Sequence, residues 1–289
     1  MWSAVQAILN GLLYGALLSV IGMGMALIFG VMRIVNFAHG AFMMLGMYVA
    51  YLLFDSLGIS PYLGFVAAAA VLFVLGFLAY QGLLRRIADR SEFMQILLTL
   101  GISQMIIGGA QIKFGTNFLQ INLPVRGSYQ RIGGLITLNN GDLLAAGIAV
   151  ALAVGMFWFV MKTRFGRALR AIAQNRYAAP LIGINVQRTQ AIAFGLGIAA
   201  VGLAGGLLLP ALFLYPEVGA QYTLRSFVIV VLGGMGSIEG AAIAGLVIGV
   251  VESLTALYIG QQWALVIDFA IFLLVLSLRP AGLFGSQRV

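Results

Sequence analysis

The sequence predicts an all-α protein, a polytopic integral membrane helix bundle with eight or nine spans and discontinuous segments. Of its 289 residues, 62% are hydrophobic and only 8% are charged, whereas a soluble domain carries roughly 25% charged residues. A bilayer-spanning helix uses roughly 20 residues, so the hydrophobic residues suffice for about nine spans at most. This composition excludes a soluble enzyme and a large domain outside the membrane. Residues 1–289 are therefore expected to form a single transmembrane domain.

Nine apolar runs give the expected order of the helices. They cover about residues 4–31, 40–54, 61–84, 93–112, 143–161, 190–214, 224–235, 241–259 and 263–278. The two short runs, the second and the seventh, adjoin glycine-rich breaks, so each is expected to be a half-helix or part of a discontinuous span. Several glycine pairs lie four residues apart, which places both glycines on one helix face and predicts close helix packing in lipid. These pairs include Gly11 with Gly15 and Gly245 with Gly249.

Basic residues predict the orientation of the bundle. The connector 162–190 holds six lysines and arginines and no acidic residue, and the positive-inside rule places it in the cytoplasm. Connector 113–142 is then expected outside, residues 279–289 inside, and the N-terminus outside if all nine runs cross. The first run has no basic segment before it and no cleavage site, which indicates a retained span. The net charge of +8 thus reflects loop orientation and gives no reason to expect nucleic-acid binding.

The chain lacks the residues that most catalytic and metal sites require. It has no cysteine and a single histidine, which excludes thiolate nucleophiles, cysteine-ligated metals and histidine-cluster sites. It also has no GxxxxGK[ST], HExxH, GxSxG or GxGxxG motif. We therefore expect no metal and no cofactor bound by this chain and no ATP hydrolysis of its own. If ATP drives its function, partner subunits use it.

The basic connector is predicted to contain a short amphipathic helix at 166–179. Its apolar side includes Leu169 and Ile172, and arginines occupy the rest. Pro180 is expected to end the helix, because the residue before a proline avoids the α region, and Asn185 is expected to cap the next span. Such a helix suits docking of a cytoplasmic partner. The alternative is a solvated basic loop that only sets topology.

Three stretches in order resemble one transporter family. They are GVMRIVNFAHGAFMMLGMY (30–48), GRALRAIAQNRYAAPLIGIN (166–185) and VIVVLGGMGSIEGAAIAGLVIG (228–249), followed by the terminal LRPAGLFG (278–285). Together they resemble the H-type permease subunit of high-affinity ABC transporters for branched-chain amino acids. Ala178, Ala179 and Gly183 stand where such permeases carry the short signature of their coupling helix.

The resemblance implies a multi-pass permease of the bacterial inner membrane that imports leucine, isoleucine or valine. Its implied partners are a paralogous permease subunit, two cytoplasmic ATPase subunits, a periplasmic substrate-binding protein and the lipid bilayer. Coupling to the ATPases is assigned by this resemblance to the connector residues Gly166, Arg167, Arg170, Ala178, Ala179 and Gly183. The alternatives are a urea or short-amide permease of the same family, a proton-coupled secondary transporter and a membrane-embedded enzyme. Whether the pore is homodimeric or heterodimeric is left open.

The first break carries polar residues. Arg33, Asn36 and His39 recur at every third position, which predicts one polar stripe on a helix or a polar re-entrant turn, and Gly40 permits a break in the backbone. Polar groups at membrane depth face protein or a water-filled path. The stripe is interpreted either as a wall of the translocation path or as an anchor at the headgroups.

The second break is rich in glycine. Discontinuous helices mark binding sites or gates in transporters, and a tight turn between consecutive spans explains the same glycines equally well. The residues of this candidate gate are Gly233, Gly234, Gly236 and Ser237.

Glu252 and Asp268 are the acidic residues deepest within apolar runs. A charge at mid-bilayer costs roughly 3 kcal/mol or more, so both are expected to face protein, with Arg225 or Arg33 as a basic partner. They are interpreted as a structural pair, or alternatively as a proton path together with His39.

Overall fold

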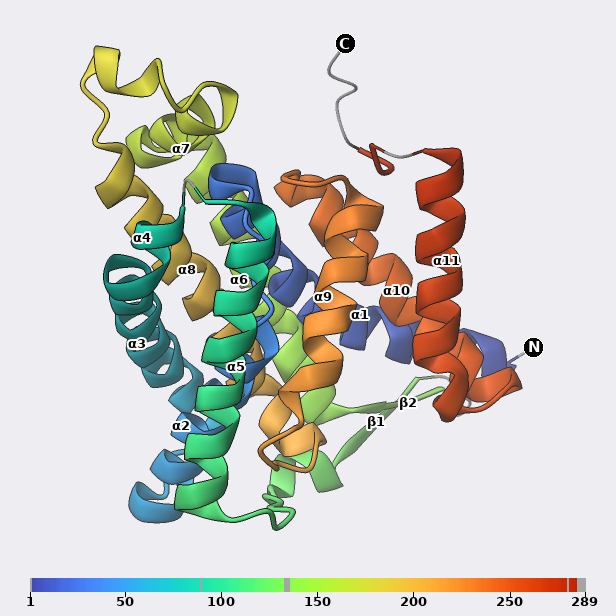
Figure 1. The fold of residues 1–289 in the computed structure, drawn as a ribbon. Helices are drawn as coiled ribbons and strands as arrows, with labels where there is room; N and C mark the ends of the chain where they lie inside the picture. Colours follow the sequence, from blue (N-terminus) through green and yellow to red (C-terminus); the bar gives the residue numbers. More distant parts are fainter. Residues whose placement is uncertain (1, 89, 133–135, 280, 285–289) are drawn as a thin grey trace.

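The computed structural model describes residues 2–88, 90–132, 136–279 and 281–284. Within these residues the chain is a bundle of long helices (Figure 1). Eight helical stretches among them are long and apolar enough to cross a bilayer. These stretches contain α1 (Trp2–Met32), α2 (His39–Leu57), α3 (Pro61–Ala79) continued by α4 (Arg85–Ile87), α5 (Glu92–Phe114), α6 (Asn140–Lys162), α8 (Val186–Leu208), α10 (Ile238–Tyr258) and α11 (Ala264–Leu278).

The predicted number of spans is confirmed, and so is the short seventh run. That run forms α9 (Gly219–Gly233), which has 15 residues and is too short to cross a bilayer upright. The second run is longer than expected, because its helix has 19 residues. Every long helix lies within a few residues of its predicted run, since apolar length in a bilayer is fixed by the thickness of the hydrocarbon.

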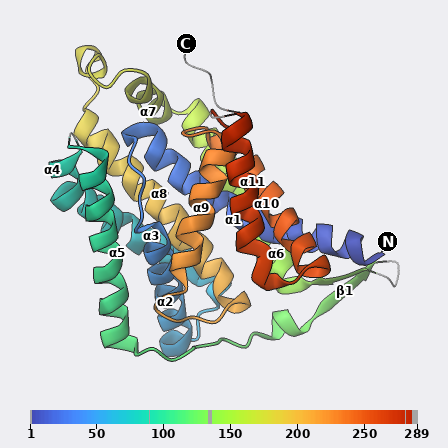
Figure 2. The same cartoon turned by 45° about the vertical axis from the view of Figure 1, so that its right-hand side comes forward.

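The two ends of the bundle carry different connectors. One end holds α7 (Arg164–Gln174), and we call it the α7 end. The opposite end holds an antiparallel hairpin of β1 (Tyr129–Ile132) and β2 (Ile136–Asn139), and we call it the hairpin end (Figures 1 and 2). The sequence analysis did not predict this hairpin. Residues 279–289 were predicted to lie inside. Of these, Pro280 and residues 285–289 lie outside the described residues.

The N-terminal part of α1 is joined to the hairpin end. The side chain of Gln6 donates to the carbonyl of Thr137 (2.7 Å) and accepts from the backbone N–H of the same residue (2.8 Å). The N-terminus and connector 113–142 therefore lie at the end opposite to connector 162–190. This relative arrangement agrees with the predicted orientation.

Helices α1 and α8 form the centre of the bundle. In their apolar stretches 78% and 72% of the residues are buried within the chain, against 11% in α11 and 22% in both α5 and α6. The predicted close packing at glycine faces is found between α1 and α10: a methyl group added to Gly249 would lie 2.4 Å from the Cα of Gly15. Only glycine permits this approach of two helix backbones in lipid.

The connection from α1 to α2 is a discontinuous segment inside the bundle. Arg33 leaves α1 with a left-handed φ of 55°, and residues 34–36 have no helical structure. His39, which begins α2, places Nε2 at 3.0 Å from the carbonyl oxygen of Ile21. Because α1 rises about 1.5 Å per residue, Ile21 lies roughly 16 Å before the end of α1. The chain therefore returns alongside α1 and begins α2 deep within the protein, as the discontinuity prediction requires.

Candidate functional site

Helix α7 is joined to α6 by a sharp bend at Thr163. The Thr163 hydroxyl donates to the carbonyl of Phe159 (2.6 Å) and accepts from the N–H of Gly166 (3.0 Å). It thereby satisfies one carbonyl at the end of α6 and one N–H at the start of α7. The helix ends at Gln174, earlier than the expected residue 179, because the Asn175 side chain accepts from the following backbone N–H groups and competes with the helix. Asn185 caps α8, as predicted.

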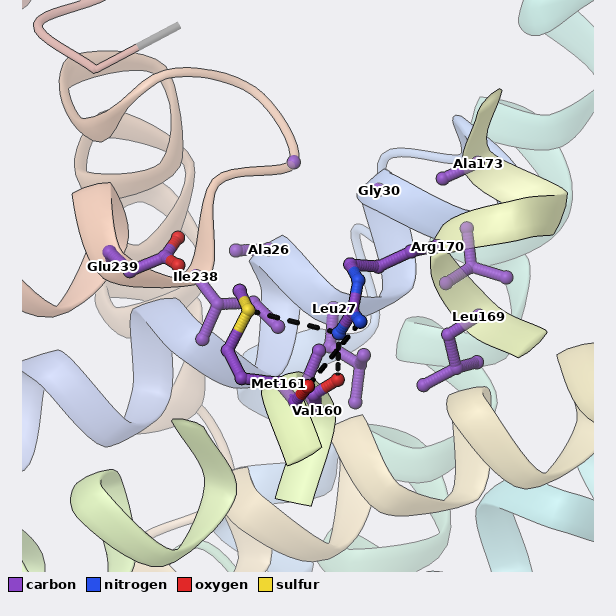
Figure 3. Close-up of a pocket in the computed structure, with 12 residues that line it drawn as sticks. Ala26, Leu27, Gly30, Val160, Met161, Leu169, Arg170, Ala173, Ile238 and Glu239 are labelled. Carbon is purple, nitrogen blue, oxygen red and sulfur yellow. Dashed lines mark hydrogen bonds between the residues drawn. The ribbon is translucent and has the colours of Figure 1, made fainter. Parts of the chain in front are cut away.

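Two contacts fasten α7 to the last turn of α6. A methyl group added to Gly166 would lie 2.0 Å from the carbonyl oxygen of Val160, so the two backbones are in direct contact. The guanidinium of Arg170 donates to the carbonyls of Val160 and Met161, the latter at 3.3 Å (Figure 3). These are carbonyls that a helix end leaves unpaired, and a cation there also opposes the negative end of the helix dipole. Arg170 therefore binds α7 to α6, and its role in coupling to the ATPases stays a prediction.

The outer side of this region is unusually apolar. Arg167 is exposed, but the largest exposed groups follow α7 on both sides of Pro180: Tyr177 is 89% exposed, Leu181 87% and Ile182 72%. We call Tyr177, Leu181 and Ile182 the apolar tip. Sequence reasoning missed it, although large apolar side chains inside a strongly basic connector were the available signal.

The three small residues carried over from the family signature differ in their surroundings. Ala178 is exposed, whereas Ala179 is buried and begins the short 3-10 turn that holds Pro180. Gly183 ends that turn with φ of 80°, a left-handed conformation that glycine adopts without steric cost. These residues shape the connector so that the apolar tip stands away from the bundle.

The polar residues of the first break are enclosed in the protein. Asn36 is 1% exposed and His39 is fully buried, while the N–H of Gly40 donates to the Thr223 hydroxyl of α9 (2.9 Å). Arg33 is exposed at the end of α1. The predicted single stripe on a helix is wrong, because three-residue spacing aligns side chains only on a helix and this segment is not helical. The re-entrant alternative describes it, and a role in the translocation path stays a prediction.

The second break is a tight turn between α9 and α10 at the α7 end. Gly234 and Gly236 have φ of 98° and 89°, which requires glycine. Ser237 then caps α10 by accepting from the N–H of Gly240 (3.0 Å). Gly236 packs on the backbone of Gly30 in α1, because an added methyl group would meet its Cα at 3.0 Å. The turn is therefore locked against the last turn of α1, and a gating role stays a prediction.

A cavity of about 90 Å³ separates α7 from this turn. Its walls come from the end of α1, the end of α6, α7 and the start of α10 (Figure 3). Most of the lining is apolar, and Arg170 and Glu239 are its two charged residues.

The buried acids meet a basic partner in the middle of the bundle. The guanidinium of Arg225 binds both carboxylate oxygens of Glu252, at 2.6 Å and 3.1 Å, and donates to the side chain of Gln221 (3.0 Å). The ring of Tyr222 lies 5.2 Å from the guanidinium carbon, a cation–π distance. Of the two predicted partners Arg225 is confirmed and Arg33 is not.

Asp268 completes this cluster from α11. It is fully buried and faces Glu252. Ala264 and Asp268 are the buried residues of α11, so the acid marks where this peripheral helix docks on the bundle. Within the described residues the second ring nitrogen of His39 has no hydrogen-bond partner. A hydrogen-bonded relay from His39 to the two acids is therefore not formed in this part of the chain.

Comparison with known proteins assigns the family. Residues 7–276 match the family described as branched-chain amino acid transport system / permease component. The chain belongs to this permease family. The family, together with the eight helices of the described residues that are long and apolar enough to cross a bilayer, defines a multi-pass protein of the inner membrane.

The relatives of this permease carry matching names. It is 30% identical to the high-affinity branched-chain amino acid transport system permease protein LivH of Salmonella typhimurium, over 99% of this chain and 96% of the relative. It is 30% identical to the probable permease LivH of Methanocaldococcus jannaschii, over 97% and 92% of the two chains. The fold was also compared with the solved structure of PsaBC from Streptococcus pneumoniae in complex with Fab. The superposition includes 92% of this chain and 89% of the PsaBC chain, with 12% sequence identity and a TM-score of 0.49.

Proposed function

We propose that this permease carries leucine, isoleucine or valine across the inner membrane as the membrane subunit of an ATP-driven importer. Two cytoplasmic ATPase subunits use the ATP, a periplasmic binding protein delivers the substrate, and a paralogous permease completes the pore. The matched family and the names of the relatives support the cargo and the class. The apolar tip beyond α7 supports the ATPase docking and is the observation that carries the mechanism.

Docking of an ATPase subunit at the apolar tip is supported by the free-energy cost of exposing apolar side chains to water. Three large apolar side chains are exposed on one short connector, and a concentration of exposed apolar surface marks an interaction site. Tyrosine in particular is frequent among the residues that dominate binding energy at protein interfaces. Arg167, exposed on α7, adds a positive charge to the same connector. A cytoplasmic subunit with an apolar groove and an acidic rim fits this surface.

The bend at Thr163 supports transmission of force from the ATPases. Because Arg170 and Gly166 join α7 to the last turn of α6, a push on α7 moves α6 with it. Buried Leu169 and Ile172 pack the other side of α7 against the bundle. ATP-driven closure of the ATPase pair is thus expected to rock α6 against the central helices, which is alternating access.

The face of α5 supports a path beside a second permease. Gln104 is exposed on this face, and Gly101 and Gly108 have open space where a side chain would stand. A glutamine amide facing hydrocarbon without a partner costs several kcal/mol. We therefore place the paired permease and the mostly apolar route of the amino acid along α5, which lies at the edge of the bundle (Figure 2).

Reconstitution tests the proposed function. Proteoliposomes with this permease, its paralogue, both ATPases and the binding protein should accumulate labelled leucine only with ATP, and unlabelled isoleucine and valine should compete. Vanadate should stop uptake and a protonophore should not. Uptake that resists vanadate and follows the proton gradient would assign a secondary transporter, and competition by urea or short amides would assign the other cargo class.

A further inference from the structure

The cavity at the α7 end has the chemistry of a small-molecule site. Arg170 and Glu239 come from opposite walls, one on α7 and the other in the first turn of α10 (Figure 3). Both are half-buried. In the described part of the chain, Arg170 binds neutral carbonyls and the sulfur of Met161. Among the described residues Glu239 has one hydrogen bond, from the Ser237 hydroxyl at 3.4 Å, and no ion pair.

Two half-buried charges of opposite sign, neither of which has an ion-pair partner among the described residues, are complementary to a zwitterion. A charged group removed from water is stabilised by a partner of opposite charge. The guanidinium of Arg170 retains donors for a carboxylate, and Glu239 accepts from an ammonium group. Between them Leu27, Val31 and Ile238 supply apolar walls. An α-amino acid with an aliphatic side chain presents these three features together.

The size of the cavity fits the same class. It offers about 90 Å³ to the centres of water-sized atoms. One ordered water needs roughly 10–15 Å³ on this scale, so the cavity holds roughly six to nine atoms of that size. This corresponds to the non-hydrogen atoms of valine or leucine.

The position of the cavity suggests how a ligand bound in it would affect transport. One wall belongs to the α6–α7 unit that the proposed ATPase contact moves, and the opposite wall is the α9–α10 turn, which is locked to α1 through Gly30. A ligand that binds both walls stabilises the conformation in which the distance between the walls matches the length of the ligand. By its differential affinity it shifts the population of the transporter toward that conformation.

We propose that this cavity is a regulatory site on the cytoplasmic side that binds an aliphatic α-amino acid, the product of transport, through Arg170 and Glu239 and thereby slows further import. The inference rests on the proposed function, which gives the side of the membrane on which the cavity lies and the class of molecule that is transported. The ligand is recognised by its carboxylate, its ammonium and its apolar side chain, so removal of any one of them is expected to abolish the effect.

Proteoliposomes of phosphatidylcholine and phosphatidylglycerol test the proposal with the complete transporter. ATP and rising leucine are enclosed in the lumen, and binding protein with labelled leucine is added outside, so that only molecules with ATPases facing the lumen report. The initial rate should fall by about fivefold or more, the usual size of coupling between two sites. Isoamylamine and 4-methylpentanoate in the lumen, which lack the carboxylate and the ammonium respectively, should leave the rate unchanged. Adding phosphatidylethanolamine tests a zwitterionic headgroup as the competing source of the same chemistry.

The variant Glu239→Gln should import at the normal rate with an empty lumen and lose the inhibition by luminal leucine. Glu217→Gln, which removes an exposed carboxylate near the hairpin end, is the matched control and should keep the inhibition. Equal inhibition of wild type and Glu239→Gln, or a wild-type rate independent of luminal leucine, would overturn the proposal. Inhibition by phosphatidylethanolamine alone would assign the cavity to lipid instead.

A binding measurement keeps the inference separate from the proposed function. Equilibrium dialysis of labelled leucine with the purified permease–ATPase complex, without binding protein, requires no transport. The wild-type complex should bind leucine and Glu239→Gln should not. Absence of ATP-driven uptake with an empty lumen would refute the proposed function, whereas equal binding by the two complexes would refute the site.

Discussion

The contact of Arg170 with the end of α6 makes a quantitative prediction about coupling. Replacement by glutamine keeps a polar side chain of moderate length and removes the guanidinium. Hydrogen bonds to charged groups contribute about 1.5–3 kcal/mol each, and Arg170 makes two to the carbonyls of Val160 and Met161. Because Arg170 is half-buried, we take the lower end, about 3 kcal/mol for the pair. That loss raises the population in which α7 is detached from α6 by about two orders of magnitude.

The assay is the number of leucine molecules imported per ATP hydrolysed in proteoliposomes with all subunits. Arg170→Gln should keep ATP hydrolysis and import severalfold less leucine per ATP, because a detached α7 moves without α6. Arg167→Gln is the matched control, since it removes the same charge from the exposed side of α7. It should lower hydrolysis and import together and leave their ratio unchanged. Arg170→Lys should restore part of the ratio, because an ammonium also donates to carbonyls. A normal ratio in Arg170→Gln, or an equal fall in Arg167→Gln, would refute the reasoning.

Three further predictions concern stability and docking. Arg225→Ala leaves a buried carboxylate without its partner and should cost about 3–5 kcal/mol, seen as a lower Tm in detergent; the double variant with Glu252→Ala should be less destabilised, and equal Tm values would count against a buried ion pair. Gly249→Ala should destabilise by about 1–3 kcal/mol by overpacking against α1, whereas Gly147→Ala, in open space on α6, should leave the Tm unchanged. Leu181→Ala should weaken binding of the isolated ATPase subunit by about tenfold or more, as removal of an interface anchor does, and unchanged binding would place the docking surface elsewhere.

The helices were predictable because the bilayer allows few stable backbone conformations. A run of about 20 apolar residues has no other stable form in hydrocarbon than a helix, so composition and run length located every long helix. Close packing at the glycine faces and a basic partner for Glu252 were predictable for the same reason, because small residues pack closely in lipid and charges must be paired there. Sequence motifs supplied the family, which composition alone does not distinguish among transporters.

The candidate site was less predictable, because it depends on the directions of side chains, which the path of the backbone determines. Arg167 and Arg170 look equivalent in a basic amphipathic helix, and the bend at Thr163 alone turns one to solvent and the other onto α6. Arg33, Asn36 and His39 were predicted to form a helix stripe or a re-entrant turn, and the sequence does not show the tertiary contact of His39 with Ile21 that accompanies the turn. The apolar tip was overlooked because exposure of Tyr177 depends on where Asn175 ends α7.

The central claim is that ATPase subunits bind the permease at the apolar tip, and site-specific cross-linking tests it most directly. The chain has no cysteine, so a single cysteine carries a photo-cross-linker without competing sites. In the purified complex, probes at Tyr177→Cys and Leu181→Cys should each form an adduct with the ATPase subunit. A probe at Phe118→Cys, an aromatic position in connector 113–142 that is 68% exposed, should form none. Absence of the adduct from both tip positions, or an equal adduct from Phe118→Cys, would contradict the account.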